Sequence, residues 1–231
     1  MEPFRARPLV ARIRARHPGG FTLVEMMVSL SIMFIITAIA ITGQSTFNQS
    51  LLLNDTAYTV ALSARQAQSL GLSSRKFNGV QNGGYGMHLA SANPNSYLLF
   101  ADVTATAAAP SWCPAATVAG TPEDKAGNCL YDGINETFQT YALTKGFTIS
   151  DFCGKTGTGL KCMSTGDINS LDVVFLRPNT ISILTGLLSG PSGTKSQFSC
   201  VQISVKSPSG SAVQTIRISQ LGEVSVGQVC S

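Results

Sequence analysis

The chain contains a long apolar run that begins at Phe21 and ends at Ile41. Within its 21 residues, the only polar side chains are threonines, serines and a single acid, Glu25. A helix rises about 1.5 Å per residue, so a run of this length spans the roughly 30 Å hydrocarbon core of a bilayer. The run therefore predicts one membrane-spanning helix.

Beyond this run, hydrophobic residues recur at spacings of three, four or seven positions. They are Phe47, Leu51, Ala57, Tyr58, Ala61, Leu62, Ala64 and Ala67. Polar residues such as Asn48 and Arg65 lie between them. This pattern is typical of an amphipathic helix with one buried stripe. We expect one continuous helix over residues 21–70, ended by Gly71.

The rest of the chain carries short segments typical of β-strands. Val201, Ile203 and Val205 alternate with polar residues, which favours a sheet with one buried and one solvent-facing side. The expected strands cover residues 87–89, 96–102, 147–152, 171–176, 181–184, 198–205, 213–219 and 223–226. Turn residues between the last three favour antiparallel hairpins. The predicted fold class is α+β, with the long helix packed on an antiparallel β-sheet.

Basic residues are concentrated at the start of the chain. Residues 1–20 contain five arginines and one glutamate, which accounts for the net charge of +4, because the remainder has eleven basic and eleven acidic residues. A neutral remainder offers no basic patch, so no nucleic-acid partner is expected. By the positive-inside rule, the arginines hold residues 1–20 in the cytoplasm, which predicts a single-pass protein whose globular part lies outside it.

Six cysteines lie between residues 113 and 230 of the chain. They are Cys113, Cys129, Cys153, Cys162, Cys200 and Cys230. An even number downstream of an export segment predicts up to three disulfides formed in an oxidising compartment. Six cysteines allow fifteen pairings. Proximity favours pairing them two by two in sequence order, and the other pairings stay open.

Two interpretations of the N-terminal segment stay open from these patterns. Ala38-Ile39-Ala40 fits the small-x-small pattern of signal peptidase, so cleavage after Ala40 would release a Sec-exported, β-rich binding or adhesion protein. A membrane-anchored form of the same protein is a variant of this alternative. Glu25 argues against an ordinary signal, because a charge within a membrane helix is unfavourable by about 2.5 to 3.5 kcal/mol at mid-membrane.

Residues 20–27, Gly-Phe-Thr-Leu-Val-Glu-Met-Met, combine a basic leader, a boundary glycine, an aromatic residue and a glutamate before an apolar helix. Here the chain resembles the class III signal of type IV prepilins and type II secretion pseudopilins. The resemblance implies a pilin fold, cleavage by prepilin peptidase between Gly20 and Phe21, and N-methylation of Phe21. It implies a non-enzymatic filament subunit that an inner-membrane assembly platform joins to other pilin or pseudopilin subunits, in a periplasmic or cell-surface filament.

Cleavage at this site would give Glu25 a partner. It creates an α-amino group at Phe21, and the carboxylate of Glu25 can pair with such an amine on a neighbouring subunit. A buried ion pair contributes more to register than to stability, so Glu25 would set the stagger between subunits. The resemblance divides the chain into a leader (1–20), a transmembrane and assembly half of the helix (21–42), an amphipathic half (43–71) and a globular β-rich domain (72–231).

A second, broader resemblance concerns the globular domain. Residues 57–75, with an Ala-Arg-x-Ala core, and the closing strands up to Val226 look like the minor pseudopilin H (GspH), FimT and FimU group. The resemblance implies a minor subunit. Proteins called FimT can bind DNA through a basic C-terminal segment. The same end of this chain has only Lys206 and Arg217, so DNA binding is not expected.

Two further patterns have both a chemical and a plain structural interpretation. His88 with a cysteine would form a Cys-His nucleophilic site, but a sheet histidine among disulfide-bonded cysteines is favoured. Asp132, Asn135 and Glu136 would hold Ca²⁺ through their oxygens, but a solvated loop is favoured. No catalytic residue, metal, cofactor or small-molecule substrate is therefore predicted.

Overall fold

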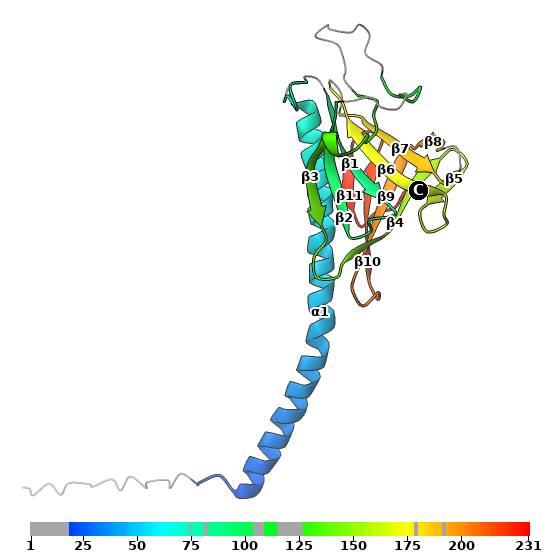
Figure 1. The fold of residues 1–231 in the computed structure, drawn as a ribbon. Coiled ribbons are helices and arrows are strands. Elements are labelled where there is room, and N and C mark those ends of the chain that lie inside the picture. The colour runs from blue at the N-terminus through cyan, green and yellow to red at the C-terminus, as the bar shows by residue number, and fades with distance from the viewer. Residues whose placement is uncertain are drawn as a thin grey trace, which may run out of the picture. The chain divides into compact units, whose positions relative to one another are not determined.

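One long helix, α1, runs over Leu23–Leu72 and is followed by strands (Figure 1). The computed structural model describes residues 19–73, 75–80, 83–103, 109–114, 127–177, 180–190 and 193–231. They form two units, residues 1–45 and residues 46–231. The second unit contains the later part of α1 and all of the strands. The predicted helix is confirmed, displaced by two residues toward the C-terminus.

The strands form two antiparallel sheets. The six-stranded sheet has the order β3-β2-β1-β6-β7-β8, and the five-stranded sheet has the order β11-β10-β9-β4-β5. Their bounds are β1 Gly84–Ala90, β2 Ser96–Asp102, β3 Thr137–Ala142, β4 Thr148–Thr156, β5 Gly159–Cys162, β6 Ile168–Phe175, β7 Ser182–Leu188, β8 Lys195–Gln197, β9 Cys200–Lys206, β10 Val213–Ser219 and β11 Val224–Val226. A short 3₁₀ turn, Ile134–Glu136, precedes β3. The α+β class is confirmed, with two sheets instead of the single sheet we expected.

Three strands have no counterpart in the sequence prediction, and all three are sheet edges. They are β3, β5 and β8. An edge strand is exposed on one side, so its residues lack the strong apolar alternation of a central strand. The strand β8 illustrates this, because its three residues are Lys-Ser-Gln.

Gly71 lies inside α1 instead of ending it. A Cβ atom at position 71 would lie 2.4 Å from the carbonyl oxygen of Phe175 in β6. The glycine is therefore required for the close approach of the last helical turn to the sheet. After Leu72 the helix stops, and the hydroxyl of Ser73 donates to the carbonyl of Leu70 at 2.7 Å.

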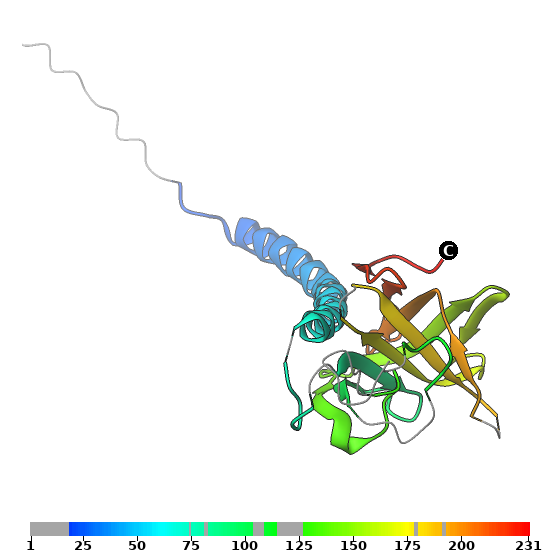
Figure 2. The ribbon, with the colours of Figure 1, turned by 90° about the horizontal axis from the view of Figure 1, so that it is seen from above.

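Phe198 joins the two sheets at the bend between β8 and β9. Its ring is buried and lies between Gly154 of β4 and Gly186 of β7. A Cβ atom at either glycine would lie within 2.4 Å of that ring. Two glycines thus accommodate the ring at the point where the chain passes from the six-stranded to the five-stranded sheet. Figure 2 shows the ribbon of the sheets beside the later part of α1.

The main core lies between α1 and the inner faces of both sheets. The helix contributes small side chains, chiefly Ala57, Ala64 and Ala67, all fully buried. The five-stranded sheet contributes Ile203 and its neighbours in β9, while the polar residues between them are partly exposed, as predicted. Small residues on the helix let it approach both sheets closely, which maximises dispersion contacts.

A second apolar cluster covers the outer face of the six-stranded sheet. It consists of Phe100, Cys113, Cys129, Val174, Leu176 and Ile183, with Leu98, Trp112 and Tyr131 packed against it. The strand β6 is therefore buried on both sides, which corrects the expected solvent-facing side for this sheet. The cause is the segment around the Cys113–Cys129 disulfide, which packs over the sheet.

The three disulfides pair the cysteines in sequence order. The Cα–Cα distances are 5.8 Å for Cys113–Cys129, 4.1 Å for Cys153–Cys162 and 5.9 Å for Cys200–Cys230. The second bond links directly opposed residues of β4 and β5. The third fixes the C-terminal end of the chain to the start of β9. Of residues 104–126, the structure describes only 109–114.

Candidate assembly site on the helix

The first turn of α1 has a Thr-x-x-Glu sequence, Thr22 to Glu25, which is typical of a capping box. The backbone N–H of Glu25 donates to the hydroxyl of Thr22 at 3.2 Å, which satisfies one of the free donors of the helix end. The acid also lies where the helix dipole favours negative charge. Glu25 therefore has a role within its own chain, and its side chain remains exposed.

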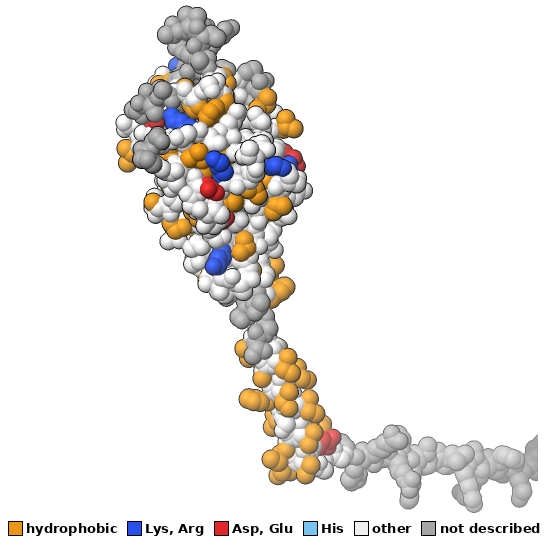
Figure 3. Space-filling model, turned by 90° about the vertical axis from the view of Figure 1, so that its right-hand side faces the viewer, with side chains coloured by type: hydrophobic (Ala, Val, Ile, Leu, Met, Phe, Trp, Pro, Cys, Tyr) orange, Lys and Arg blue, Asp and Glu red, His pale blue; other side chains and the backbone are white. Residues whose placement is uncertain are grey.

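The following segment, Leu23–Ile41, is long and apolar enough to cross a membrane, and none of it is buried within the protein. Figure 3 shows hydrophobic side chains along the visible face of this part of the helix. The hydroxyls of Ser29, Ser31 and Thr37 donate to carbonyls four residues earlier, at 2.7 to 2.8 Å. These hydroxyls are satisfied by the helix itself, as an apolar environment requires.

A secretory signal has a similar apolar helix, so the residues before it decide the assignment. Residues 16–41 match a family model described as the prokaryotic N-terminal methylation motif. This motif marks the chain as type IV pilin-like or pseudopilin-like. Neither a curated protein nor a solved structure matches the chain.

The motif indicates how this pilin-like protein is processed, where it is anchored and what kind of role it has. It supports a subunit that a peptidase processes and that assembles with other pilin subunits. Together with the exposed apolar helix, it indicates membrane anchoring of a globular domain. It also suggests a structural, non-enzymatic role. The predicted site residues Gly20, Phe21 and Glu25 all lie inside the matched segment.

The second part of α1 carries a stripe of large exposed side chains: Phe47, Leu51, Tyr58 and Leu62, each more than half exposed. At 100° per residue they lie within an arc of about 60°. The buried alanines are centred about 140° away on the same helix. The expectation of one buried stripe was therefore wrong, because the recurring apolar residues form two stripes, and only the small ones face the sheets. We call these four residues the outer stripe.

Polar side chains on α1 fix which face is turned outward. The guanidinium of Arg65 donates to the Val224 carbonyl at 3.0 Å, and the amide of Gln68 donates to the Gly222 carbonyl at 3.1 Å. On the six-stranded sheet, the Tyr141 hydroxyl donates to Gln66 at 2.9 Å. The helix is thus held to one edge of each sheet, and it cannot roll to bury the outer stripe without losing these bonds.

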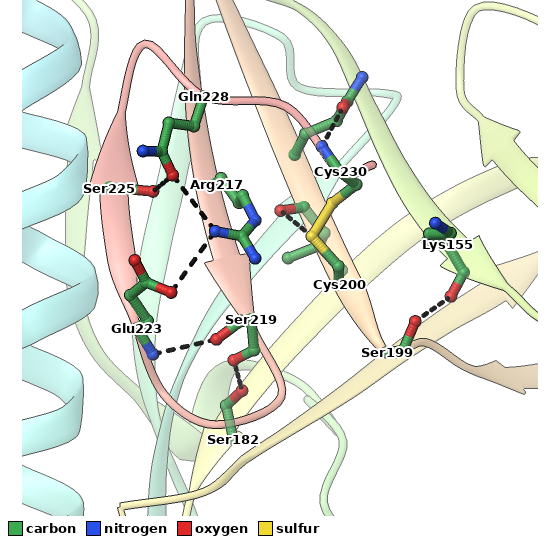
Figure 4. Close-up of a disulfide and its surroundings, with 12 residues drawn as sticks. Lys155, Ser182, Ser199, Cys200, Arg217, Ser219, Glu223, Ser225, Gln228 and Cys230 are labelled. Carbon is green, nitrogen blue, oxygen red and sulfur yellow. Dashed lines mark hydrogen bonds and ion pairs between the residues drawn. A yellow bond between two sulfur atoms is a disulfide. The ribbon is translucent and has the colours of Figure 1, made fainter.

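The hairpin that receives Arg65 and Gln68 is itself held in place (Figure 4). Arg217 in β10 lies 3.4 Å from the Glu223 carboxylate and 3.2 Å from the Gln228 amide oxygen. The Cys200–Cys230 bond then closes the segment that contains β9, β10 and β11. Sequence reasoning missed this arrangement, because its members only meet once the last strands pair.

His88 is a sheet histidine, as favoured from the sequence. Its Nδ1 lies 2.6 Å from the carboxylate of Asp172 on the neighbouring strand β6. The ring of Tyr131 lies 4.6 Å from the imidazole, centroid to centroid. All six cysteines are disulfide-bonded. A Cys-His nucleophile is thereby ruled out.

The loop that contains Asp132, Asn135 and Glu136 helps to hold the segment around the Cys113–Cys129 disulfide against the six-stranded sheet. We call that segment the covering segment. The buried carboxylate of Glu136 accepts the N–H groups of Val103 at 3.0 Å and Asp132 at 2.8 Å. Both oxygens thus have backbone donors, which favours a structural role over Ca²⁺ binding.

Asp102, which sequence reasoning missed, plays a similar part at the end of β2. It accepts the N–H groups of Asn128 at 2.8 Å and Cys129 at 2.7 Å. Burial raises the pKa of Asp102 well above its usual value, while the two N–H donors act in the opposite direction. The carboxylate therefore holds the covering segment next to the Cys113–Cys129 bond.

Proposed function

We propose that this protein is a structural subunit of a type IV pilus or type II secretion-like filament. Prepilin peptidase removes residues 1–20 by cutting between Gly20 and Phe21, and the new N-terminus at Phe21 is methylated. The match of residues 16–41 to the prokaryotic N-terminal methylation motif carries this proposal. The exposed apolar helix behind the motif supports it, because such a helix requires lipid before assembly and other helices afterwards.

In this proposal Glu25 has two successive roles. Before assembly, it belongs to the capped first turn of its own helix. In the filament, its carboxylate pairs with the methylated amine of Phe21 on a neighbouring subunit, and this pairing sets the stagger. The amine exists only after cleavage, so processing precedes correct assembly.

The outer stripe is the second contact of the proposed filament. Its four large side chains face away from the sheets and are exposed in the single chain. Contiguous exposed apolar surface of this kind is typical of interaction sites. The neighbouring subunit's helix, which carries similar side chains, would cover it.

The resemblance of residues 57–75 to the pseudopilin H, FimT and FimU group favours a minor subunit over a major one. We place the globular domain in the periplasm or on the cell surface, where an oxidising environment maintains the three disulfides.

Intact-mass analysis of the protein purified from the membrane tests the processing step. A chain that begins at methylated Phe21 is the expected result. A chain that begins at Ile41 would instead identify a Sec-exported domain cleaved after Ala40, and an uncleaved chain would identify a plain membrane anchor. Either of these outcomes would overturn the filament proposal.

Glu25→Ala tests the assembly step. We expect membrane insertion and cleavage to stay at the wild-type level while incorporation into surface filaments falls at least tenfold, because the variant lacks the carboxylate that pairs with the amine. Immunogold labelling of filaments measures incorporation. Thr22→Ala is the matched control, because it removes the capping hydroxyl but keeps the carboxylate. Equal incorporation of Glu25→Ala and the wild type would remove the proposed role of Glu25.

A further inference from the structure

At one corner of the second unit, a row of backbone hydrogen bonds joins the two sheets. The N–H of Ser182 in β7 donates to the carbonyl of Gln220 at 2.9 Å, and the N–H of Gln220 donates to Ser199 at 3.0 Å. The N–H of Ser199 donates to Lys155 in β4, also at 3.0 Å. We call this row the seam; Figure 4 shows Ser199 beside Lys155 and Ser182 beside Ser219.

Two hollows open along the seam. One, of about 170 Å³, is lined by Trp112, Arg177 and others. The other, of about 190 Å³, is lined by Lys155, Thr156 and others. Gln197 and Gln220 line both hollows, so the two hollows are adjacent, and we call them together the groove. Each hollow alone is below the roughly 300 to 1,000 Å³ that holds a compact ligand. The groove therefore suits an extended chain that crosses both.

The lining restricts which extended chain can bind. The backbone N–H groups of Ser182, Ser199 and Gln220 already have partners, so a peptide cannot add to this corner as another strand. Recognition must come from side chains, and the two glutamine amides each both donate and accept hydrogen bonds. That double capacity matches hydroxyl groups, which also donate and accept.

Two more features of the groove define the ligand. Trp112 is half-buried, and its indole N–H donates to the buried hydroxyl of Thr185 at 3.1 Å. This bond fixes the indole and leaves the ring itself as an apolar wall. Arg177 lines one hollow and Lys155 the other, and no described lining residue is acidic. The lining therefore favours an anionic ligand whose negative charges are widely spaced, because each hollow has a single basic residue.

We propose that this groove binds an acidic polysaccharide. A sugar ring packs on Trp112, hydroxyl groups bond to Gln197 and Gln220, and a uronate carboxylate pairs with Lys155. A nucleic acid fits less well, because its affinity depends on several cations along the backbone, whereas each hollow offers one. The proposal is independent of the filament assignment, since all of these residues lie in the globular unit.

Fluorescence titration of the full chain in detergent micelles tests the proposal. Trp112 is the only tryptophan in the chain, so its emission reports binding at this wall. Oligogalacturonate should change the emission saturably. Fully methyl-esterified oligogalacturonate keeps the sugar backbone but lacks the charge, and it should bind about tenfold more weakly. No saturable change, equal binding of the ester, or stronger binding of a single-stranded oligonucleotide of similar length would overturn the proposal.

Variants then locate the site. Gln197→Ala combined with Gln220→Ala should weaken oligogalacturonate binding at least tenfold, because both amides are lost while the backbone bonds of the seam remain. Gln139→Ala, on the exposed side of β3, is the matched control and should bind like the wild type. Lys155→Ala should weaken binding, whereas Lys76→Ala, another exposed lysine, should not. Wild-type affinity for oligogalacturonate in both the double glutamine variant and Lys155→Ala would overturn the proposal. Two separate variants are used so that poor folding of one does not remove the test.

Discussion

The two parts of α1 use hydrophobic residues in opposite ways. Over Leu23–Ile41 every large apolar side chain is exposed, and none of this segment is buried within the protein. Over the later part, the alanines are buried against the sheets, while the large side chains of the outer stripe are exposed. In an ordinary amphipathic helix the large apolar residues face the core. Here the inner face is mostly alanine, with Leu53 and Val60 among them, while the four large apolar side chains of the outer stripe stay exposed.

This difference suggests what each part of the helix requires. The first part has no inner face at all, so its surroundings must be lipid or other helices. The second part has an inner face made mostly of alanines, which brings the helix close to the sheets, and an outer face that is left for a neighbouring subunit. A single helix can thus hold its globular domain tightly and still offer apolar contacts to a filament.

The largest expected effect comes from placing a charge in the first part. Ile32→Arg should disfavour membrane insertion by about 2.5 to 3.5 kcal/mol, because the exposed face of Ile32 meets lipid. Membrane fractionation with alkaline extraction measures it. The control is Ile134→Arg, at an isoleucine that is also exposed but lies on the globular unit, and this variant should fractionate like the wild type. If both variants fractionated alike, the idea that exposed apolar residues of Leu23–Ile41 face lipid, unlike those of the globular unit, would be contradicted.

A smaller effect is expected from exchanging sizes in the second part. Ala64→Leu forces a larger side chain between helix and sheets and should lower the free energy of unfolding by about 1 to 3 kcal/mol. Leu62→Ala, only two positions away, should change it by less than about 0.5 kcal/mol, since Leu62 is exposed. Denaturant unfolding of the full chain in detergent measures both.

In a filament assay the ranking of the two variants should be reversed. Leu62→Ala should have the larger effect on incorporation, because it removes part of the outer stripe. Reduced incorporation of a stably folded Leu62→Ala protein is the expected result. Wild-type incorporation would show that the outer stripe is not a contact.

A pH-dependent effect is expected at Asp102, where two N–H donors offset part of the effect of burial. Because the folded-state pKa of Asp102 is raised above 3.8, the folded chain binds more protons than the unfolded chain between those two values. Wild-type stability relative to Asp102→Asn should therefore be highest below pH 3.8 and fall as pH rises through the folded-state pKa. Unfolding measured over a pH series checks the sign. A difference that grew with pH would contradict it.

Much of the fold could be predicted from the sequence because its signals are local. The apolar run, the alternation in β9 and the hairpin turns each depend on neighbouring residues, and the structure places these elements close to their expected bounds. The edge strands β3, β5 and β8 were missed because they lack the apolar alternation of the central strands. Gly71 was assigned to a helix end because its partner, the Phe175 carbonyl, is distant in the sequence.

The candidate sites divide in the same way. The residues Gly20, Phe21 and Glu25 form a contiguous motif, so the sequence alone pointed to them. The outer stripe was assigned to the wrong face, because periodicity cannot tell which of two apolar stripes meets a sheet. The groove was not foreseen at all, since Trp112, Gln197 and Gln220 come from separate segments that only the folded sheets bring together.

The Cys200–Cys230 bond has a mechanical consequence. A force that pulls on α1 is passed through Arg65 and Gln68 to the hairpin containing β10 and β11. The ends of that segment are covalently joined across a sequence separation of 30 residues, so stretching cannot release its contour length. Tension is instead carried into β9 at the centre of its sheet. The disulfide thus keeps β10 and β11 from being pulled away from β9 one after the other.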